Sequence, residues 1–300
     1  MGHGDLRQAL EEKACFGTFL KLPRPEVVDL LALAGFDFVI CDMEHAQISE
    51  MEARTVIKAC AAVELPVTVR LPEPTQGLVN RLLEAGAVGI QMPRLRSAAD
   101  TKSLHTMMHF PPEGSRSVGI ANAWAGYGTV PVSRYLGESN ARALVIGQFE
   151  TREIEEPIDK MMQGLDVAFI GPMDLSVDFG VPGQFDHPEV VTRIHQIEEA
   201  AARTGTFMGA FVGSVEQAAK FAAAGYRYLA VSGDITMLGN SAKTLVSSLH
   251  QATNRVQSGA KELLRLPRAS HSQRLGRIAT LSRGGGIARN DDAKVFYSRL

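Results

Sequence analysis

The stretch FDFVICDMEHAQISEMEARTVIKACAAVELPVTVRLPEP, residues 36–74, contains two strand-like runs with a helical pattern between them. The runs are Phe38–Cys41 and Val67–Arg70, and the helical pattern extends from about Ser49 to Ala62. Neither run alternates cleanly between polar and apolar residues, which is typical of parallel strands that are covered on both faces. Two parallel strands need a long connection, which is usually a helix. The stretch therefore predicts a strand–helix–strand unit of a parallel sheet.

The same order of strand and helix repeats in both directions from this stretch. Further strand-like runs lie at Phe16–Leu20, Val88–Met92, Ala143–Phe149, Val167–Ile170, Phe207–Val212 and Tyr228–Ser232. Helical patterns lie at Pro25–Ala34, Thr75–Ala85 and Ala98–Met108, and a Pro/Gly-rich excursion occupies Phe110 to Glu138. Eight such units in 300 residues favour a closed barrel, and no GxGxxG motif follows the first strand, which counts against an open dinucleotide-binding sheet. We therefore predict an α/β fold, a (β/α)₈ TIM barrel.

The last part of the chain, Ser258–Leu300, differs in charge from the rest. It contains nine Lys and Arg residues and three Asp and Glu residues, so its net charge is +6, whereas the remainder of the chain carries −8. We expect a single barrel domain at residues 1–257 and a basic C-terminal extension at residues 258–300. The extension is either solvated and partly ordered, or it reaches across to an acidic neighbouring subunit.

The composition excludes several classes of partner. The formal net charge is −2 and aromatic residues make up 6% of the chain, so neither charge nor base stacking favours nucleic acid or an acidic membrane. No run of about 18 apolar residues is present, and residues 1–17 lack a signal-peptide pattern. The cysteines, Cys15, Cys41 and Cys60, form no CxxC pair, which is typical of a reducing compartment. We expect a cytoplasmic protein with no nucleic-acid partner and no membrane partner.

Polar residues gather where four of the predicted strands end. Asp42–His45 follows the second run, Arg70 ends the third, Gln148–Glu150 ends the fifth, and Gly171–Asp174 follows the sixth. Charged groups directly after buried strands are unfavourable unless they are paired or bind a metal. In a (β/α)₈ barrel, the residues beyond the C-terminal strand ends build the active site. The pattern therefore predicts an active site at this end of the barrel.

Two of these residues, Glu150 and Asp174, are candidate metal ligands. They follow adjacent strands, and two carboxylates that leave positions open for water and substrate suit a hard octahedral ion such as Mg²⁺ or Mn²⁺. The alternative is that they pair with Arg152 or Lys160, or that Asp174 caps a short helix. The spacing alone leaves both interpretations open.

His45 and Arg70 are candidate catalytic residues. A histidine titrates near neutral pH and can act as a general acid or base, although an isolated histidine is also common as a structural residue. The planar fork of Arg70 can bind a carboxylate or an oxyanion, or it can form an ion pair with Glu44 or Glu73. No lysine at a strand end is evident, which argues against a Schiff-base mechanism.

Six ordered segments resemble the class II 2-oxo acid aldolases of the HpcH/HpaI type. They are AGFDFVICDMEHAQ (34–47), VRLPEP (69–74), LLEAGAVGIQMPRLRSAAD (82–100), FPPEGSRSVG (110–119), IGQFETREIEEPID (146–159) and GLDVAFIGPMDLSVDFGVPGQFDHPEV (164–190). The resemblance implies a barrel of the phosphoenolpyruvate/pyruvate type. It also implies that a divalent ion, Mg²⁺, Mn²⁺ or Co²⁺, supports cleavage or formation of a 4-hydroxy-2-oxo acid from pyruvate, or a close 2-oxo acid, and an aldehyde.

The resemblance implies a role for each matching residue. Glu150 and Asp174 would bind the metal, and His45 would be the acid/base residue. Arg70 would bind the 2-oxo oxygen of the substrate and stabilise the enolate. Glu84 would act from a neighbouring subunit to orient the histidine, at a position where the family often has the shorter Asp.

The remaining candidate residues would support the metal and the substrate. Asp42 would act through metal-bound water, and Glu44 and Gln148 would lie behind the ligands. Backbone N–H groups in the segment containing Gly171, Pro172 and Met173 would bind the substrate carboxylate. Met43 and Met173 stand where the family commonly has Gly or Ala, so we expect a more crowded or more apolar site. Trp124 is expected near the mouth of the site or at a subunit contact.

The resemblance also implies a homohexamer, built as a trimer of dimers, in which the helical pattern at about Ile235 to Val256 packs on a neighbour. Two other functions stay open. One is a related enolate-forming lyase, such as an oxaloacetate decarboxylase or a malyl- or citramalyl-type CoA lyase, although the barrel segment shows no compelling basic region for CoA phosphates. The other is a barrel-fold binding protein without catalytic activity, which a metal-binding titration would distinguish.

Overall fold

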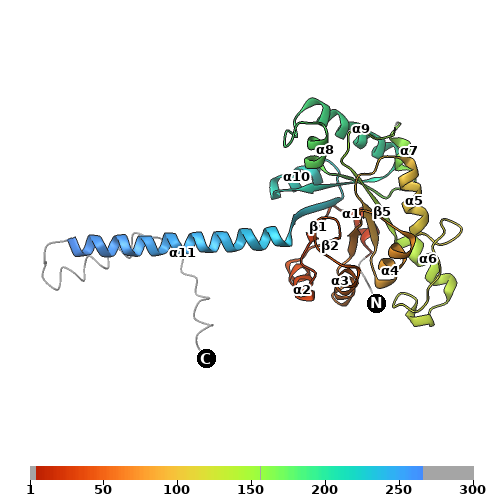
Figure 1. The fold of residues 1–300 in the computed structure, drawn as a ribbon, viewed down its shortest axis with the longest axis horizontal. Helices are drawn as coiled ribbons and strands as arrows, with labels where there is room; N and C mark the ends of the chain where they lie inside the picture. Colours follow the sequence, from red (N-terminus) through yellow and green to blue (C-terminus); the bar gives the residue numbers. More distant parts are fainter. Residues whose placement is uncertain (1–4, 156, 266–300) are drawn as a thin grey trace. The chain divides into compact units, whose positions relative to one another are not determined.

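Eight parallel strands form a closed barrel in the computed structural model, which describes residues 5–155 and 157–265. The strands pair in chain order, β1 to β8, and β8 pairs with β1 to close the ring. Figure 1 shows the strands at the centre of the barrel and the helices around them. The barrel class predicted from the sequence is confirmed.

The strands agree with the predicted runs to within about one residue. They are β1 (Cys15–Leu20), β2 (Phe38–Asp42), β3 (Val67–Arg70), β4 (Gly89–Met92), β5 (Leu144–Phe149), β6 (Val167–Ile170), β7 (Phe207–Val212) and β8 (Tyr228–Gly233). The helices are α1 (Leu6–Glu12), α2 (Pro25–Ala34), α3 (Glu50–Ala62), α4 (Gln76–Ala85), α5 (Ala98–Met108), α6 (Val132–Arg142), α7 (Asp159–Met162), α8 (Pro172–Asp178), α9 (Pro188–Thr204), α10 (Val215–Ala223) and α11 (Asp234–Arg265). A short 3₁₀ helix, η1, spans Gly126–Gly128.

Local sequence signals set the ends of several helices. Pro25 occupies the first turn of α2, and Gly35, with a φ of 88°, ends the helix in the left-handed conformation that glycine adopts most readily. Ser49 caps α3 through a reciprocal pair of hydrogen bonds with Glu52. Thr75 accepts a hydrogen bond from a backbone N–H group of α4. Ser49 and Thr75 therefore fix where α3 and α4 begin, and Gly35 fixes where the chain leaves α2.

Two helices differ from the sequence prediction. The N-terminal segment forms α1, which Asp5 caps, and its Leu6 and Leu10 are buried against the barrel. The Pro/Gly-rich excursion was expected to reach Glu138, but α6 already begins at Val132. Tertiary packing stabilises both helices: α1 is too short to be stable alone, and α6 buries Tyr135 and Asn140.

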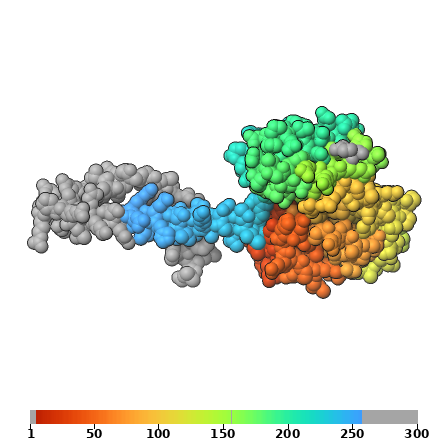
Figure 2. Space-filling model, turned by 45° about the horizontal axis from the view of Figure 1, so that its top comes forward, coloured from red at the N-terminus to blue at the C-terminus, as the bar shows by residue number. Residues whose placement is uncertain are grey.

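Two apolar layers lie on the two sides of the strands. In β2, Phe38 and Ile40 belong to the cluster inside the barrel, whereas Val39 and Cys41 belong to the cluster between strands and helices. This alternation follows from the two-residue repeat of a strand. In Figure 2, the surface of the first strand–helix units of the chain (red to orange) lies beside that of the later strand–helix units (green to cyan).

The chain divides into two compact units, Met1–Asn240, which contains the barrel, and Ser241–Leu300. The boundary expected at residue 257 falls inside α11, and the assignment of 1–257 and 258–300 as domains stays a prediction. Most of the basic extension, residues 266–300, lies outside the described residues. Within residues 5–155 and 157–265, no helix has both the length and the apolar character that crossing a membrane requires.

Candidate active site

The alternation of side chains along each strand carries polar residues to the inside of the barrel at its C-terminal end. Phe38 and Ile40 of β2 lie in the inner cluster, and Asp42 follows two residues later on the same side. In the same way Ile146 of β5 lies inside, and Gln148 and Glu150 follow it. The inward-facing rows of these strands therefore bring the candidate site residues to the end of the barrel where the sequence predicts an active site.

A cavity of about 230 Å³ lies at these strand ends. Its lining includes six of the residues selected from the sequence: Arg70, Gln148, Gly171, Pro172, Met173 and Asp174. It also includes residues that were not selected: Phe19, Lys21, Phe169, Phe211, Ser232, Gly233 and Thr236. These additional residues belong to β1, β6, β7, β8 and the start of α11, so strands that carry no selected charged residue also contribute to the site.

Glu150 is a buried carboxylate that lies close to other carboxylates. Its Oε1 atom accepts a hydrogen bond of 2.8 Å from the backbone N–H of Arg94, and its Oε2 atom accepts one of 2.7 Å from the amide of Gln148. Burial raises the pKa of Glu150, and the negative charges of Asp174 and Glu44 raise it further against the effect of the hydrogen bonds. Among the described residues, no lysine or arginine side chain forms an ion pair with Glu150, so the expected alternative partners Arg152 and Lys160 do not neutralise it.

Asp174 and Gly171 complete this side of the cavity. Asp174 lies in the first turn of α8, but Gly171 is the capping residue and no side chain makes a capping hydrogen bond, so the alternative that Asp174 caps the helix was wrong. A Cβ atom at Gly171 would lie 2.8 Å from Oε2 of Glu150, so only glycine lets the chain pass this close to the carboxylate. In the described parts of the chain, no group of three or more His, Cys, Asp and Glu side chains could hold a metal ion. A buried carboxylate with no cationic partner and a second carboxylate beside it nevertheless fit a divalent ion that takes its other ligands from water and substrate.

Arg70 and Asp42 form a buried ion pair at the ends of β3 and β2. Arg70 donates from Nε to Oδ1 of Asp42 at 2.9 Å and from a terminal nitrogen to Oδ2 at 2.7 Å. Its other terminal nitrogen lies 3.3 Å from Glu44, so the predicted pair with Glu44 is present, whereas no pair with Glu73 is seen among the described residues. The guanidinium also lies 4.5 Å from the centre of the Phe19 ring. These contacts fix the orientation of Arg70 at the edge of the cavity.

His45 lies in the loop after β2, and its side chain is 57% exposed. Its backbone N–H donates to Asp42, and its Nε2 atom lies 3.6 Å from a carboxylate oxygen of Glu44. The exposure disfavours a role as a packed core residue and leaves the imidazole accessible to a substrate.

Glu84 lies elsewhere, on α4, in a cavity that Arg54 and Arg81 also line. Within the described residues of a single chain, Glu84 makes no hydrogen bond or ion pair with His45. The dyad implied by the resemblance therefore stays a prediction that depends on a neighbouring subunit.

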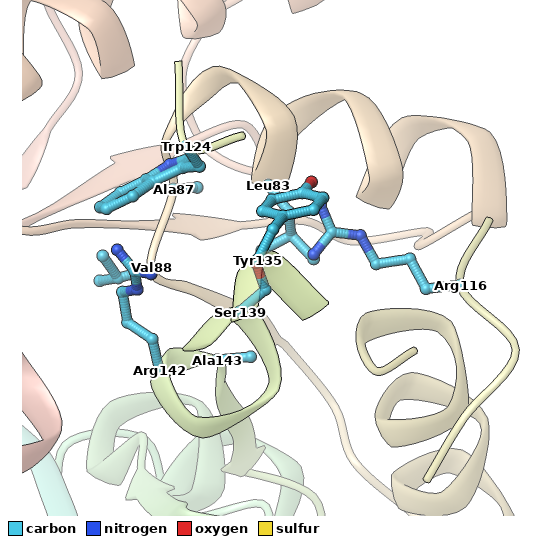
Figure 3. Close-up of a pocket in the computed structure, with 9 residues that line it drawn as sticks. All are labelled: Leu83, Ala87, Val88, Arg116, Trp124, Tyr135, Ser139, Arg142 and Ala143. Carbon is cyan, nitrogen blue, oxygen red and sulfur yellow. The ribbon is translucent and has the colours of Figure 1, made fainter. Parts of the chain in front are cut away.

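Trp124 does not line the strand-end cavity, so its expected place at the mouth was wrong. It lines a separate, small cavity of about 20 Å³ together with Leu83, Arg116 and Tyr135. Figure 3 shows the indole of Trp124 and the side chain of Arg142 on one side of this cavity. The Arg142 guanidinium lies 3.6 Å from the centre of the Trp124 ring. The folding of the loop after α5 decides this placement, and no local sequence signal indicates it.

Lys21 corrects a further expectation, because it is a lysine directly after a strand. It follows β1, lines the cavity, and places its ammonium 3.1 Å from Oδ2 of Asp42, with its side chain 28% exposed. The expectation that no lysine lies at a strand end was therefore wrong. The signal was present, since Lys21 follows the apolar run Phe16–Leu20 just as Asp42 follows the next run.

The Asp42 carboxyl group gives the fold a specific dependence on pH. Burial alone would raise its pKa, but the hydrogen bonds and charge of Arg70, with the His45 N–H group and Lys21, outweigh burial and lower the pKa to about 2. A lowered carboxyl pKa stabilises the folded state above the unfolded-state value of about 3.9, and the stabilisation is lost as the pH falls toward the folded-state value. The loss amounts to roughly 2 to 3 kcal/mol.

We therefore expect the free energy of unfolding of the wild type to fall more steeply between about pH 4 and about pH 2 than that of Asp42→Asn. Denaturant titrations at a series of pH values measure this difference. The exposed Asp186→Asn serves as the control and should keep the slope of the wild type. Equal slopes for the wild type and Asp42→Asn would contradict the stabilising role of the Asp42–Arg70 pair.

Comparisons with known proteins place this chain among aldolases and lyases. The sequence profile of the HpcH/HpaI aldolase/citrate lyase family matches residues 15–241. The hydroxypyruvate/pyruvate aldolase of Paraburkholderia phytofirmans is 31% identical over 233 residues, which cover 75% of this chain and 89% of that protein. The 4-hydroxy-2-oxo-heptane-1,7-dioate aldolase of Escherichia coli is 31% identical over 248 residues, which cover 81% of this chain and 93% of that protein.

A solved structure gives the same result. The crystal structure of a HpcH/HpaI aldolase/citrate lyase family protein from Burkholderia cenocepacia matches with a TM-score of 0.75 and 30% identity, over 82% of this chain and 98% of that chain. The fold, the family profile and the sequence identity over most of both chains are consistent with one another. The chain belongs to the HpcH/HpaI aldolase/citrate lyase family.

Proposed function

We propose that this chain is a divalent-metal-dependent class II aldolase. It cleaves or forms a 4-hydroxy-2-oxo acid, with pyruvate or a close 2-oxo acid and an aldehyde as its small-molecule partners. The observation that carries the proposal is the buried Glu150 carboxylate, which has no cationic partner among the described residues. Asp174 beside it lines the strand-end cavity together with Arg70. Membership of an aldolase and lyase family supports the same chemistry.

Glu150 and Asp174 would hold the divalent ion, Mg²⁺ or Mn²⁺ with Co²⁺ as a further candidate, while Asp42, Glu44 and Gln148 support this arrangement from behind. When bound, such an ion supplies Lewis-acid polarisation of the 2-oxo group. The backbone N–H groups of Met173 and Asp174 would bind the substrate carboxylate, since the start of a helix presents free donors to an anion, whereas Pro172 has no N–H and that of Gly171 donates to the carbonyl of Phe149.

The side chains of this protein then transfer the proton and stabilise the developing charge. His45 removes the proton of the 4-hydroxyl group in the cleavage direction and returns it in the synthetic direction. Arg70 keeps donors directed to the 2-oxo oxygen, where negative charge develops as the C3–C4 bond breaks and the enolate of pyruvate forms. Asp42 holds the guanidinium in place, so little reorganisation is needed when this charge appears.

A cleavage assay tests the proposal. A 4-hydroxy-2-oxo acid is incubated with the protein, and the released pyruvate is measured with a coupled dehydrogenase, with EDTA and with each divalent ion added back. We expect cleavage that EDTA abolishes and one or more of the ions restores. Pyruvate release from oxaloacetate alone, with no cleavage of any 4-hydroxy-2-oxo acid, would overturn the proposal and favour a decarboxylase.

We further propose that the enzyme is a homohexamer, a trimer of dimers, in which Glu84 of one subunit orients His45 of another. The free, buried cysteines support a reducing, cytoplasmic location. Light scattering at micromolar concentration should give about six times the chain mass of 32.4 kDa. A mass near that of one chain would contradict the assembly and the shared dyad.

A further inference from the structure

The cavity contains a second cationic side chain for which the proposed reaction has no role. Among the described residues that line it, only Lys21 and Arg70 are lysine or arginine. Lys21 follows β1, whereas Glu150 and Asp174 follow β5 and β6. In a closed ring of eight strands, β1 stands opposite β5, so the strand ends that Lys21 and Glu150 follow face each other across the barrel.

The ion pair with Asp42 does not account for all of the binding capacity of Lys21. Asp42 already accepts two hydrogen bonds from Arg70 and two from the backbone N–H groups of Glu44 and His45. An ammonium group has three donors, and Asp42 occupies one of them at 3.1 Å. Since the Lys21 side chain is 28% exposed at a residue that lines the cavity, its remaining donors are available to a ligand.

The backbone at Lys21 is held in place by a residue that follows β8, the strand that pairs with β1 and closes the barrel. The backbone N–H groups of Lys21 and Leu22 both donate to one oxygen of Asp234, at 2.9 and 2.8 Å. Asp234 is 5% exposed and starts α11 directly after β8. With its backbone tied to Asp234 and its ammonium tied to Asp42, Lys21 is fixed before any ligand arrives, which lowers the entropy lost on binding.

Two hydroxyl-bearing residues share this side of the cavity. The register of β1 against β8 shifts between Gly17 and Phe19, and Ser232 adopts a φ of 58°, which is uncommon for a residue other than glycine. Such an irregularity redirects side chains at a strand end. Ser232 and Thr236 line the cavity beside Lys21, so an ammonium and two hydroxyl groups are available to a carboxylate.

Aromatic rings form the wall next to these polar groups. Phe19 and Phe211 both line the cavity, and the centres of their rings are 6.0 Å apart. A short apolar chain can pack against such a wall. A ligand that fits both features has an apolar middle and an anionic end.

We propose that Lys21, with Ser232 and Thr236, binds the carboxylate of an acceptor aldehyde and so makes the enzyme prefer acidic aldehydes to neutral ones. This inference rests on the proposed aldolase function. The 2-oxo acid occupies the side formed by Glu150 and Asp174, and the end of the aldehyde remote from the new bond points to Lys21. Lys21 is a specificity-determining residue here and forms no covalent bond with the substrate.

The test compares two acceptors of equal chain length, 4-oxobutanoate and butanal, in carbon–carbon bond formation with pyruvate. Loss of a hydrogen bond to a charged group reduces binding by about 10- to 100-fold. Lys21→Met should therefore lower the ratio of kcat/KM for 4-oxobutanoate to that for butanal by about this factor, and Lys21→Arg should restore most of it. Lys13→Met is the matched control, because Lys13 pairs with Asp37 at the other end of β1 and should leave the ratio unchanged.

Two results would overturn the role of Lys21. The first is an equal loss for both acceptors in Lys21→Met, with the fold intact by circular dichroism, which would mean that Lys21 acts only through Asp42 and Arg70. The second is a mass increase on the Lys21 peptide after borohydride treatment with pyruvate, which would make Lys21 a Schiff-base residue. If the wild type forms no product with either aldehyde while binding a divalent ion, the aldolase proposal itself fails, and the inference fails with it.

Discussion

Glu150→Gln is expected to weaken the binding of Mn²⁺ by at least about 100-fold, because even outer partners of metal ligands alter affinity by about 10- to 100-fold. Glutamine has nearly the shape of glutamate, so the fold should be retained. It lacks the negative charge, which strengthens the binding of a hard cation to its oxygen ligand. Titration calorimetry of the metal-free protein with MnCl₂ measures the effect.

The matched control is Asp178→Asn, which removes a carboxylate that accepts a hydrogen bond from the Arg152 backbone and does not line the cavity. It should bind Mn²⁺ as the wild type does. Unchanged affinity in Glu150→Gln would show that Glu150 is not a ligand.

The free energy of unfolding, measured in EDTA without metal, distinguishes whether Glu150 is a metal ligand or a residue that stabilises the fold. Burial raises the pKa of Glu150, so its ionised form is unfavourable in the folded protein when no cation is present. Glu150→Gln should then be at least as stable as the wild type in EDTA. If Glu150 served mainly to stabilise the fold, the variant would be less stable in EDTA.

Substitutions of His45 and of Arg70 are expected to slow different steps of the reaction. His45→Ala should slow aldol cleavage by about 10²- to 10⁴-fold, the usual contribution of a positioned acid or base. It should affect the exchange of the pyruvate methyl protons less, because the proton that His45 transfers belongs to the hydroxyl group of the other fragment. Arg70→Lys should slow both reactions, because an ammonium cannot keep the two-point contact with Asp42 and also face the enolate oxygen.

Arg203→Lys is the control for the loss of an arginine fork. Arg203, on the exposed surface of α9, also donates two hydrogen bonds to one carboxylate. They run to the two oxygen atoms of Asp159 at 2.7 and 3.1 Å. It should keep both reactions. Normal methyl exchange in Arg70→Lys, with loss of cleavage only, would remove the enolate-stabilising role from Arg70.

The barrel and much of its site can be predicted from the sequence because both depend on short-range regularities. Strand and helix periods alternate eight times, and a two-residue repeat carries Asp42, Arg70 and Glu150 from the inner rows of three strands to the same end. The same regularity places Lys21 there, because it follows the inner residues Cys15 and Phe19 of β1 at the same two-residue spacing.

Other features depend on contacts that the sequence does not reveal locally. Trp124 lies beside Arg142 because of how the loop after α5 folds back, and neither residue marks that contact by spacing. The position of Ser232 depends on a register shift between β1 and β8, which are far apart in sequence. A role for Glu84 at His45 needs a second copy of the chain, so the contact depends on assembly and not on the spacing of residues within one chain.

Deuterium incorporation into the methyl group of pyruvate tests the central claim most directly, because it follows enolate formation without any aldehyde. The protein is freed of metal with EDTA, dialysed, and incubated with pyruvate in D₂O, with and without Mg²⁺, while NMR follows loss of the methyl proton signal. Metal-dependent enolate chemistry at Glu150 and Asp174 predicts rapid exchange in the wild type with Mg²⁺, and exchange at the level of the protein-free control in EDTA and in Glu150→Gln. Equally rapid exchange in EDTA, or in Glu150→Gln, would contradict it.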